Sequence, residues 1–239
     1  MAKSLRLKIG IAGFDEMIED GIPRGTNLLL CGGPGTGKTT FSIQFLYNGA
    51  TKYQEKGLYI SLSESLTKIK SCMLNFGWNL TELEDQEKIR LVDLSAVCYG
   101  ISVSEVKVKA LEELVKKNIE EIKPSRVAVD SLASLSILHG NSTERRRNIA
   151  HIFRTLSETG CTSLLTSEAR SSSLEREFHI EEYLAQGVVL LHTFIRQGKI
   201  TRAIQIEKML GAKHDVQLRP YDIKSMQGIV VYPREELFV

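Results

Sequence analysis

The sequence of 239 residues has few cysteines, no long hydrophobic run and almost no excess of charge of either sign. Its four cysteines are Cys31, Cys72, Cys98 and Cys161. They lie far apart, without a C-x-x-C pair, which argues against a disulfide framework or a zinc site. No apolar stretch approaches the ~20 residues of a membrane-spanning helix. The first residues interleave apolar and charged side chains, unlike a signal peptide. We therefore expect a cytoplasmic protein with reduced thiols and no membrane insertion.

The charge balance limits the classes of binding partner. The 31 lysines and arginines against 29 acidic residues leave a net charge of +2. This small excess gives no support for nucleic acid or an anionic membrane as an obligate partner, although it does not exclude a local basic patch. Hydrophobic residues make up 42% of the chain and charged residues 25%, which excludes general disorder. Because no linker, repeat or low-complexity stretch is evident, we expect a single domain over residues 1–239.

Short apolar segments rich in β-branched residues alternate with longer segments of helical periodicity. The predicted strands are Asn27–Cys31, Leu58–Leu62, Ile89–Leu94, Arg126–Asp130 and Thr162–Thr166, and the helices between them begin near Lys38, Leu66, Val103 and Thr143. This order predicts an α/β fold with a mostly parallel, twisted sheet flanked by helices. From Gly187 onward the segments are strand-like, at Val188–Phe194, Ile200–Met209, Val216–Ile223 and Ile229–Tyr232. We expect these last strands to extend the sheet in an antiparallel manner.

The segment Gly32–Thr39 matches the phosphate-loop pattern G-x-x-x-x-G-K-[ST] between a predicted strand and a predicted helix. Glycines let backbone N–H groups turn toward phosphate oxygens, and the helix N-terminus adds partial positive charge. In this pattern Lys38 reaches the β- and γ-phosphates and the Thr39 hydroxyl ligates Mg²⁺. The predicted nucleotide contacts in the loop are Gly33, Pro34, Gly35, Thr36, Gly37, Lys38, Thr39 and Thr40. The alternative is a glycine-rich turn without a ligand, but the complete pattern favours a nucleoside triphosphate.

A second ligand for Mg²⁺ is predicted at the end of another apolar strand. Asp130 ends the segment Arg126–Asp130, and parallel strands place their carboxyl ends at the same edge of the sheet as the phosphate loop. The alternative is an aspartate that caps a helix or a turn. Together with the loop, the metal-ligand interpretation is favoured.

Four segments together resemble KaiC-like ATPases of the RecA superfamily, a group that includes archaeal single-domain proteins similar to RadA paralogues. These segments are the phosphate loop, the strand ending at Asp130, the opening Ile9–Gly25 and the closing Ile206–His214. The resemblance extends from about Ile9 to about Tyr232, nearly the whole chain. It implies a RecA-type core that binds ATP with Mg²⁺ as cofactors. It also implies a homo-oligomeric ring, expected to be a hexamer, with nucleotide between neighbouring subunits.

Two positions depart from the family pattern that the resemblance implies. Such proteins carry a glutamate, usually two in a row, after the second strand to activate the attacking water. Here the pair is Ser63 and Glu64, and a serine hydroxyl cannot accept a proton at neutral pH as a carboxylate can. Glu64 is therefore either the remaining base or a carboxylate at a helix start. The closing motif similarly implies a Lys-x-Arg pair reaching the neighbour's γ-phosphate, but here it reads Lys208 and Leu210. Lys208 is either this trans cation or a solvated lysine.

Ser167 follows the strand Thr162–Thr166 at the place where the resemblance implies a contact with the γ-phosphate. A plain strand-end turn is the alternative.

The basic triplet Arg145–Arg147 could contact nucleic acid, but acidic residues flank it. In recombinase relatives the segment corresponding to Ala169–Gln186 touches DNA. Here its acids, Glu175, Glu177, Glu181 and Glu182, outnumber its arginines, Arg170 and Arg176, which disfavours that role.

The leading interpretation is a Mg²⁺-dependent ATPase that converts ATP to ADP and phosphate, with Lys38, Glu64 and Lys208 as catalytic residues. Ser63 and Leu210 predict weak turnover. Two rivals remain open: a switch that assembles on binding ATP and hardly hydrolyses it, and a recombination accessory protein that binds single-stranded DNA. The sequence identifies no protein partner.

Overall fold

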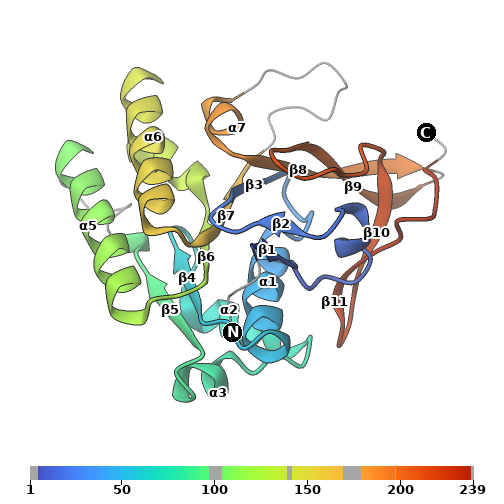
Figure 1. The fold of residues 1–239 in the computed structure, drawn as a ribbon, viewed down its shortest axis with the longest axis horizontal. Helices are drawn as coiled ribbons and strands as arrows, with labels where there is room; N and C mark the ends of the chain where they lie inside the picture. The colour runs from blue at the N-terminus through green and yellow to red at the C-terminus, as the bar shows by residue number, and fades with distance from the viewer. Residues whose placement is uncertain (1–4, 97–103, 139–141, 169–178, 197, 238–239) are drawn as a thin grey trace.

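The computed structural model describes residues 5–96, 104–138, 142–168, 179–196 and 198–237. A 9-stranded sheet runs through it in the order β11-β10-β9-β8-β3-β7-β6-β4-β5 (Figure 1). Its strands are β3 (Asn27–Gly32), β4 (Gly57–Ser61), β5 (Ile89–Asp93), β6 (Arg126–Asp130), β7 (Thr162–Ser167), β8 (Gly187–Arg196), β9 (Lys199–Met209), β10 (Arg219–Lys224) and β11 (Gly228–Val231). β3 to β8 run parallel, and β9 to β11 are antiparallel. The predicted α/β fold with antiparallel C-terminal strands is confirmed.

Helices cover both faces of the sheet. They are α1 (Lys38–Lys52), α2 (Leu66–Leu74), α3 (Leu80–Asp85), α5 (Ser104–Ile122), α6 (Ser142–Thr159) and α7 (Ile180–Leu184). Along β3, Leu28 and Leu30 join the core that contains α1, whereas Leu29 and Cys31 join the core that contains α5 and α6. This alternation follows from the two-residue period of a strand. Figure 1 shows α5 and α6 side by side, apart from α1.

Most of the predicted boundaries agree with the structure, and the differences have local causes. The strand predicted from Val216 begins only at Arg219, because Asp215 closes a turn there by accepting a hydrogen bond from Gln217 N at 2.9 Å. Several short elements were not predicted: β1 (Arg6–Leu7), β2 (Ile22–Pro23), the 3₁₀ helices η1 (Asp15–Met17) and η2 (Leu132–Leu138), α3 and α7. Strands of two residues and helices of one or two turns are too short to produce a clear period in the sequence.

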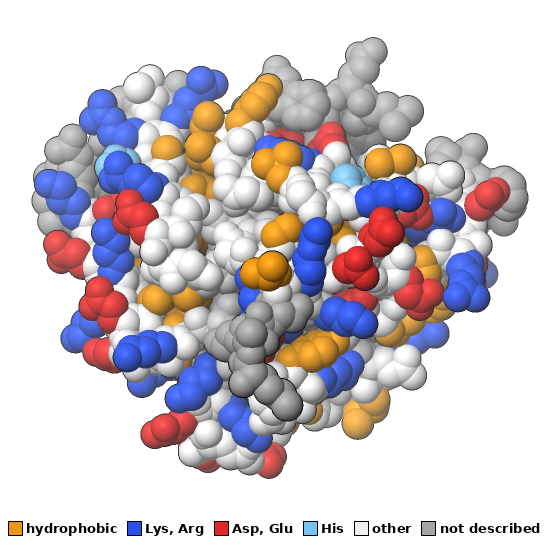
Figure 2. All heavy atoms as spheres, viewed as in Figure 1, with side chains coloured by type: hydrophobic (Ala, Val, Ile, Leu, Met, Phe, Trp, Pro, Cys, Tyr) orange, Lys and Arg blue, Asp and Glu red, His pale blue; other side chains and the backbone are white. Residues whose placement is uncertain are grey.

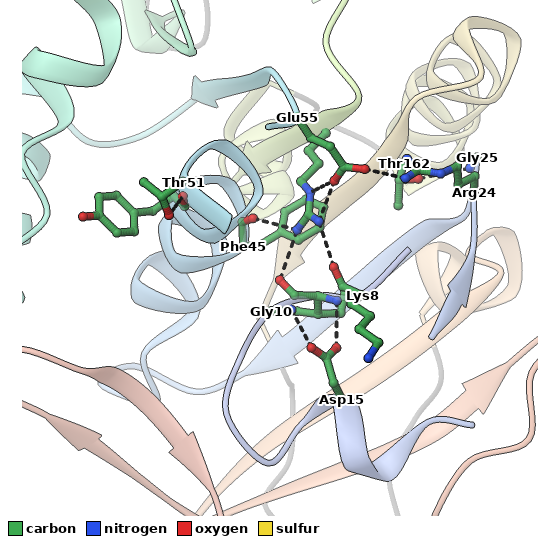
Figure 3. Close-up of polar contacts among 12 residues, drawn as sticks. Lys8, Gly10, Asp15, Arg24, Gly25, Phe45, Thr51, Glu55 and Thr162 are labelled. Atoms are coloured by element: carbon green, nitrogen blue, oxygen red, sulfur yellow. Dashed lines mark hydrogen bonds and ion pairs between the residues drawn. The ribbon is translucent and has the colours of Figure 1, made fainter. Parts of the chain in front are cut away.

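Arg126, the first residue of β6, holds the N-terminal segment against the sheet. Its side chain is 1% exposed. The guanidinium donates to the carbonyl oxygens of Lys8 at 2.8 Å, Ile9 at 3.1 Å and Phe45 at 3.0 Å, and its Nε donates to Glu55 Oε2 at 2.6 Å. Three of these partners, Lys8, Phe45 and Glu55, are labelled in Figure 3, where they surround one cluster of polar contacts. The start of β6 is therefore fixed to two other elements, and the other end of the strand carries Asp130.

Candidate nucleotide-binding site

The phosphate loop joins the end of β3 to the start of α1. Gly35 and Gly37 have φ angles of 73° and 91°, a region that glycine adopts without the strain of a Cβ atom. Gly37 is the N-cap of α1, and no described side chain caps that end of the helix. Pro34 and Gly35 are exposed, whereas Thr36 is buried. The first N–H groups of α1 are therefore available to an anion.

Lys38 lies against the backbone of the loop. Its Nζ donates to the carbonyl oxygen of Gly32 at 2.8 Å and to that of Gly33 at 3.0 Å. Burial lowers the pKa of Lys38 from its ordinary value of 10.5, and the negative charges of Asp130 and Glu168 oppose this shift. The ammonium group is thus partly desolvated, and an anion placed beside it would interact more strongly than in water.

Asp130 accepts hydrogen bonds from three hydroxyl groups on three other elements. Thr39 Oγ1 donates to Oδ2 at 2.6 Å, Tyr59 OH donates to Oδ2 at 2.9 Å, and Thr166 Oγ1 donates to Oδ1 at 2.5 Å. The aspartate is 5% exposed. The structure therefore brings the two predicted metal ligands, Thr39 and Asp130, into direct contact. A hydroxyl and a carboxylate are the hard oxygen ligands that Mg²⁺ prefers.

Tyr59 and Thr166 were not predicted as site residues. Tyr59 pairs in register with Ala128 in the neighbouring strand, so it shares a sheet face with Asp130 two residues further along. Burial raises the pKa of Tyr59 well above its usual value, and the charge of Asp130 adds to this effect. The phenol therefore remains a hydrogen-bond donor. Their place beside Asp130 depends on how β4 and β7 pair with β6, which the sequence does not state, and a tyrosine in an apolar strand is equally typical of a core residue.

The loop is also held from the antiparallel side of the sheet. Tyr221 on β10 is 1% exposed, and its hydroxyl donates to the carbonyl oxygen of Thr36 at 2.6 Å. Burial raises the pKa of this tyrosine. A Cβ atom at Gly37 would lie 2.7 Å from Ile223 Cδ1, also on β10. β10 therefore fixes the shape of the loop, a contribution that nothing in the loop motif itself indicates.

Glu64 lies at the turn between β4 and α2. Its backbone N–H donates to Ser61 Oγ at 3.1 Å, and the Ser61 hydroxyl donates to the Glu64 carbonyl oxygen at 2.5 Å. Its carboxylate pairs with Lys68 Nζ at 2.7 Å, and the Glu64 side chain is 49% exposed. Ser63 beside it is exposed. In this conformation Glu64 is a carboxylate near a helix start, one of the two interpretations left open by the sequence.

Ser167 faces the side of the sheet opposite to Asp130. Its hydroxyl donates to Glu181 Oε1 at 3.1 Å, and the same oxygen pairs with Arg145 at 2.9 Å. Glu181 and Glu182 on α7 are 0% and 6% exposed, so these two acids are buried rather than solvated. The first arginine of the basic triplet is thus used in an internal ion pair. Four other charged residues considered in the sequence analysis lie outside the described part of the chain: Arg170, Glu175, Arg176 and Glu177.

Lys208 lies at the opposite edge of the sheet from the phosphate loop of its own chain. It pairs with Val188 near the start of β8, whereas the loop follows the end of β3, which is parallel to β8. Its Nζ donates to the carbonyl oxygens of Glu182 at 3.2 Å and Tyr183 at 3.4 Å. Leu210 beside it is 55% exposed. Lys208 can therefore contact a phosphate loop only in another copy of the chain.

A parallel sheet with a glycine loop before a helix, and an aspartate at the end of a nearby strand, defines a P-loop nucleotide-binding protein of the RecA type. The family model described as "ATPase: KaiC" matches residues 7–236. The chain belongs to this family of ATPases. Within the part of the chain that the structure describes, no group of three or more His, Cys, Asp or Glu side chains could hold a metal. No helix there is long and apolar enough to cross a membrane.

Individual relatives support the same assignment. The chain is 34% identical to a UPF0273 protein of Methanocaldococcus jannaschii, covering 97% of this chain and 98% of that one. It is 33% identical to the circadian clock oscillator protein KaiC of Thermostichus vulcanus, over 93% of this chain but 43% of the clock protein. A solved structure of a KaiC-like protein from Pyrococcus horikoshii superposes with a TM-score of 0.84 at 35% identity, covering 95% and 99% of the two chains.

Proposed function

We propose that this protein binds ATP with Mg²⁺ at the loop Gly33–Thr40 and hydrolyses it slowly, with each nucleotide lying between neighbouring subunits of a ring. The observation that carries the proposal is the 2.6 Å contact between Thr39 Oγ1 and Asp130 Oδ2 beside the uncapped start of α1. A buried carboxylate next to free backbone donors would repel an anion, unless a cation lies between them. A Mg²⁺–phosphate ligand satisfies both groups.

The residues of the loop have separate tasks in this proposal. Phosphate oxygens accept hydrogen bonds from the first N–H groups of α1 and from Lys38. To reach the phosphates, the Lys38 ammonium group leaves the carbonyl oxygens of Gly32 and Gly33. Thr39 and Asp130 fit Mg²⁺, which proteins bind through one or two carboxylates together with substrate phosphates. Bound there, Mg²⁺ would neutralise negative charge on the phosphates. The hydroxyls of Tyr59 and Thr166 orient Asp130 from inside the sheet.

Slow hydrolysis is supported by the state of Glu64. Its carboxylate is occupied by Lys68 at 2.7 Å, and Ser63 cannot accept the proton of the attacking water. The barrier is therefore lowered mainly by positioning and by positive charge. Lys208 of a neighbouring copy supplies such a charge after leaving the carbonyl groups that it now contacts. The same observations favour the second candidate, a nucleotide-dependent assembly switch that hardly hydrolyses ATP.

Phosphate release and particle mass, each with and without ATP, test the proposal. Lys38→Ala is compared with wild type and with Lys52→Ala, which removes an exposed lysine from the other end of the same helix. We expect slow release and a rise in mass for wild type and Lys52→Ala, and neither for Lys38→Ala. Equal phosphate release and an equal rise in mass for wild type and Lys38→Ala would refute the site. A rise in mass without release would leave only the switch.

A glutamate at position 63, where the family pattern has a carboxylate and this chain has serine, tests the cause of slow turnover. Ser63→Glu places a carboxylate beside Glu64 at an exposed position. We expect the rate of phosphate release to rise by about 10²-fold, the lower end of the range for general acid–base catalysis. An unchanged rate would show that the missing carboxylate does not limit turnover.

Nucleic acid remains the disfavoured partner. Arg145 is engaged by buried Glu181 at 2.9 Å, and Figure 2 shows Lys and Arg side chains interspersed with Asp and Glu over the face in view. Binding through phosphates would depend steeply on salt. We expect no shift of a labelled single-stranded oligonucleotide at low salt, and a salt-sensitive shift would revive that role.

A further inference from the structure

Tyr59 presents a hydroxyl group to the candidate metal site from inside the sheet. The residue is 1% exposed and lies in β4 within the core that contains α1. Its OH donates to Asp130 Oδ2 at 2.9 Å, the oxygen that also accepts from Thr39 at 2.6 Å. A phenylalanine would fill the same space, so the hydroxyl is the only part of this side chain that packing does not explain.

We propose that Tyr59 is a positioning residue for Mg²⁺: its hydroxyl fixes the orientation of the Asp130 carboxylate. This inference rests on the proposed function. A carboxylate offers about four lone-pair directions, and here the hydroxyls of Thr39, Tyr59 and Thr166 occupy three of them. The direction that these donors leave lies on Oδ1, and in the proposal it would serve the metal or one of its water molecules.

Tyr59 and Thr166 act as a pair of fixed donors on opposite oxygens. Thr39 is itself a metal ligand in the proposal, so its hydroxyl must satisfy the metal and Asp130 together. Tyr59 does not contact the metal, and its buried ring cannot move without disturbing the core. Without this hydroxyl, Oδ2 would depend on Thr39 alone, and the carboxylate could rotate about its Cβ–Cγ bond. Outer groups that orient a metal ligand commonly change metal affinity by about 10–100-fold.

The experiment compares Tyr59→Phe with Tyr221→Phe. Both substitutions remove one hydroxyl from a tyrosine that is 1% exposed beside the phosphate loop. Tyr221 is the matched control because its hydroxyl bonds the Thr36 carbonyl rather than Asp130. The affinity for a non-hydrolysable ATP analogue is measured by calorimetry in EDTA and over a Mg²⁺ titration. Thermal unfolding without ligand records any general loss of structure.

For Tyr59→Phe we expect the Mg²⁺ midpoint to rise about tenfold, the lower range for orienting groups, while the affinity in EDTA changes less than twofold. For Tyr221→Phe we expect any change in affinity to be the same with and without Mg²⁺. A wild-type midpoint in Tyr59→Phe, or an equal rise in both variants, would overturn the inference alone. Failure of the wild type to bind the analogue, or to respond to Mg²⁺, would overturn the proposed function as well.

Discussion

Replacing Arg126 with methionine tests what holds the N-terminal segment and β6 together. The guanidinium group is buried, its Cζ lies 4.8 Å from the centre of the Phe45 ring and 5.1 Å from that of Tyr53, and its N–H groups donate to three main-chain carbonyls and Glu55. Burial lowers the pKa of Arg126, and Glu55 opposes this shift. Methionine keeps an unbranched apolar side chain over the two rings but offers no donor.

The expected loss of stability follows from the groups left behind. Each buried carbonyl without a partner costs about 1–3 kcal/mol, and breaking a buried ion pair by removing one partner costs about 3–5 kcal/mol. These figures describe overlapping effects. Glu55 keeps its ion pair with Arg24, which reduces the penalty for the carboxylate. We therefore expect Arg126→Met to lower the free energy of unfolding by about 3–5 kcal/mol.

Urea-induced unfolding measures this loss, with Arg90→Met as the matched control. Arg90 pairs with Glu121 at 2.8 Å on the surface, where the two side chains are 46% and 49% exposed, so its loss should cost about 0.2–1 kcal/mol. Arg126→Lys keeps the charge with three donors in place of five, and its stability should lie between those of wild type and Arg126→Met. The reasoning is refuted if Arg126→Met and Arg90→Met lose the same free energy.

Two further predictions concern the phosphate loop. Gly37→Ala puts a Cβ 2.7 Å from Ile223 Cδ1 at a φ of 91°, so calorimetry should show at least tenfold weaker binding of the ATP analogue. Gly160→Ala, at a φ of 69° in open space, should cost about 1–2 kcal/mol of stability without changing that affinity; equal affinities for the two variants would contradict the first prediction. Burial lowers the pKa of Lys38 in the folded protein from 10.5, so binding of the ATP analogue should weaken as the pH rises toward that lowered pKa. The contribution of Lys38 to the free energy of unfolding should become more favourable over the same pH range, because the unfolded chain, with the higher pKa, binds the proton more tightly. Lys38→Met should remove this pH dependence, and an affinity that stays constant up to pH 10.5 would contradict it.

The parallel core could be predicted because its strands are buried on both faces and therefore read as continuous apolar runs. Arg126–Asp130 is an example: the strand has the predicted bounds, and every residue in it is buried. The phosphate loop could be predicted for a different reason: its glycines and lysine occur at fixed spacings that few other structures require. By contrast, α7 has 5 residues and carries two buried glutamates. Arg145 and Ser167, from other elements, allow Glu181 to be buried, and such tertiary contacts leave no local signal.

The candidate site could be predicted in its ligands but not in the groups that orient them. Thr166 and Ser167 show the limit, because neighbouring residues of a strand face opposite sides of the sheet. The resemblance indicated this strand end as a whole, and only the structure distinguishes Thr166, which contacts Asp130, from Ser167, which contacts Glu181. Tyr59 was missed because burial alone explains a tyrosine in a strand, whereas its hydroxyl partner depends on the pairing of β4 with β6.

The two ends of β6 connect the stability of the fold to the geometry of the site. Arg126 begins the strand and Asp130 ends it, a separation of roughly 13 Å at about 3.3 Å per residue. Both neighbours of the strand are parallel and paired in register, so β6 cannot slide by one residue without turning Asp130 to the opposite face. Arg126 opposes such a shift at the far end, because its donors match carbonyl groups of two other elements. The buried guanidinium therefore acts together with the strand register to hold the carboxylate beside Thr39, although it lies outside the site itself.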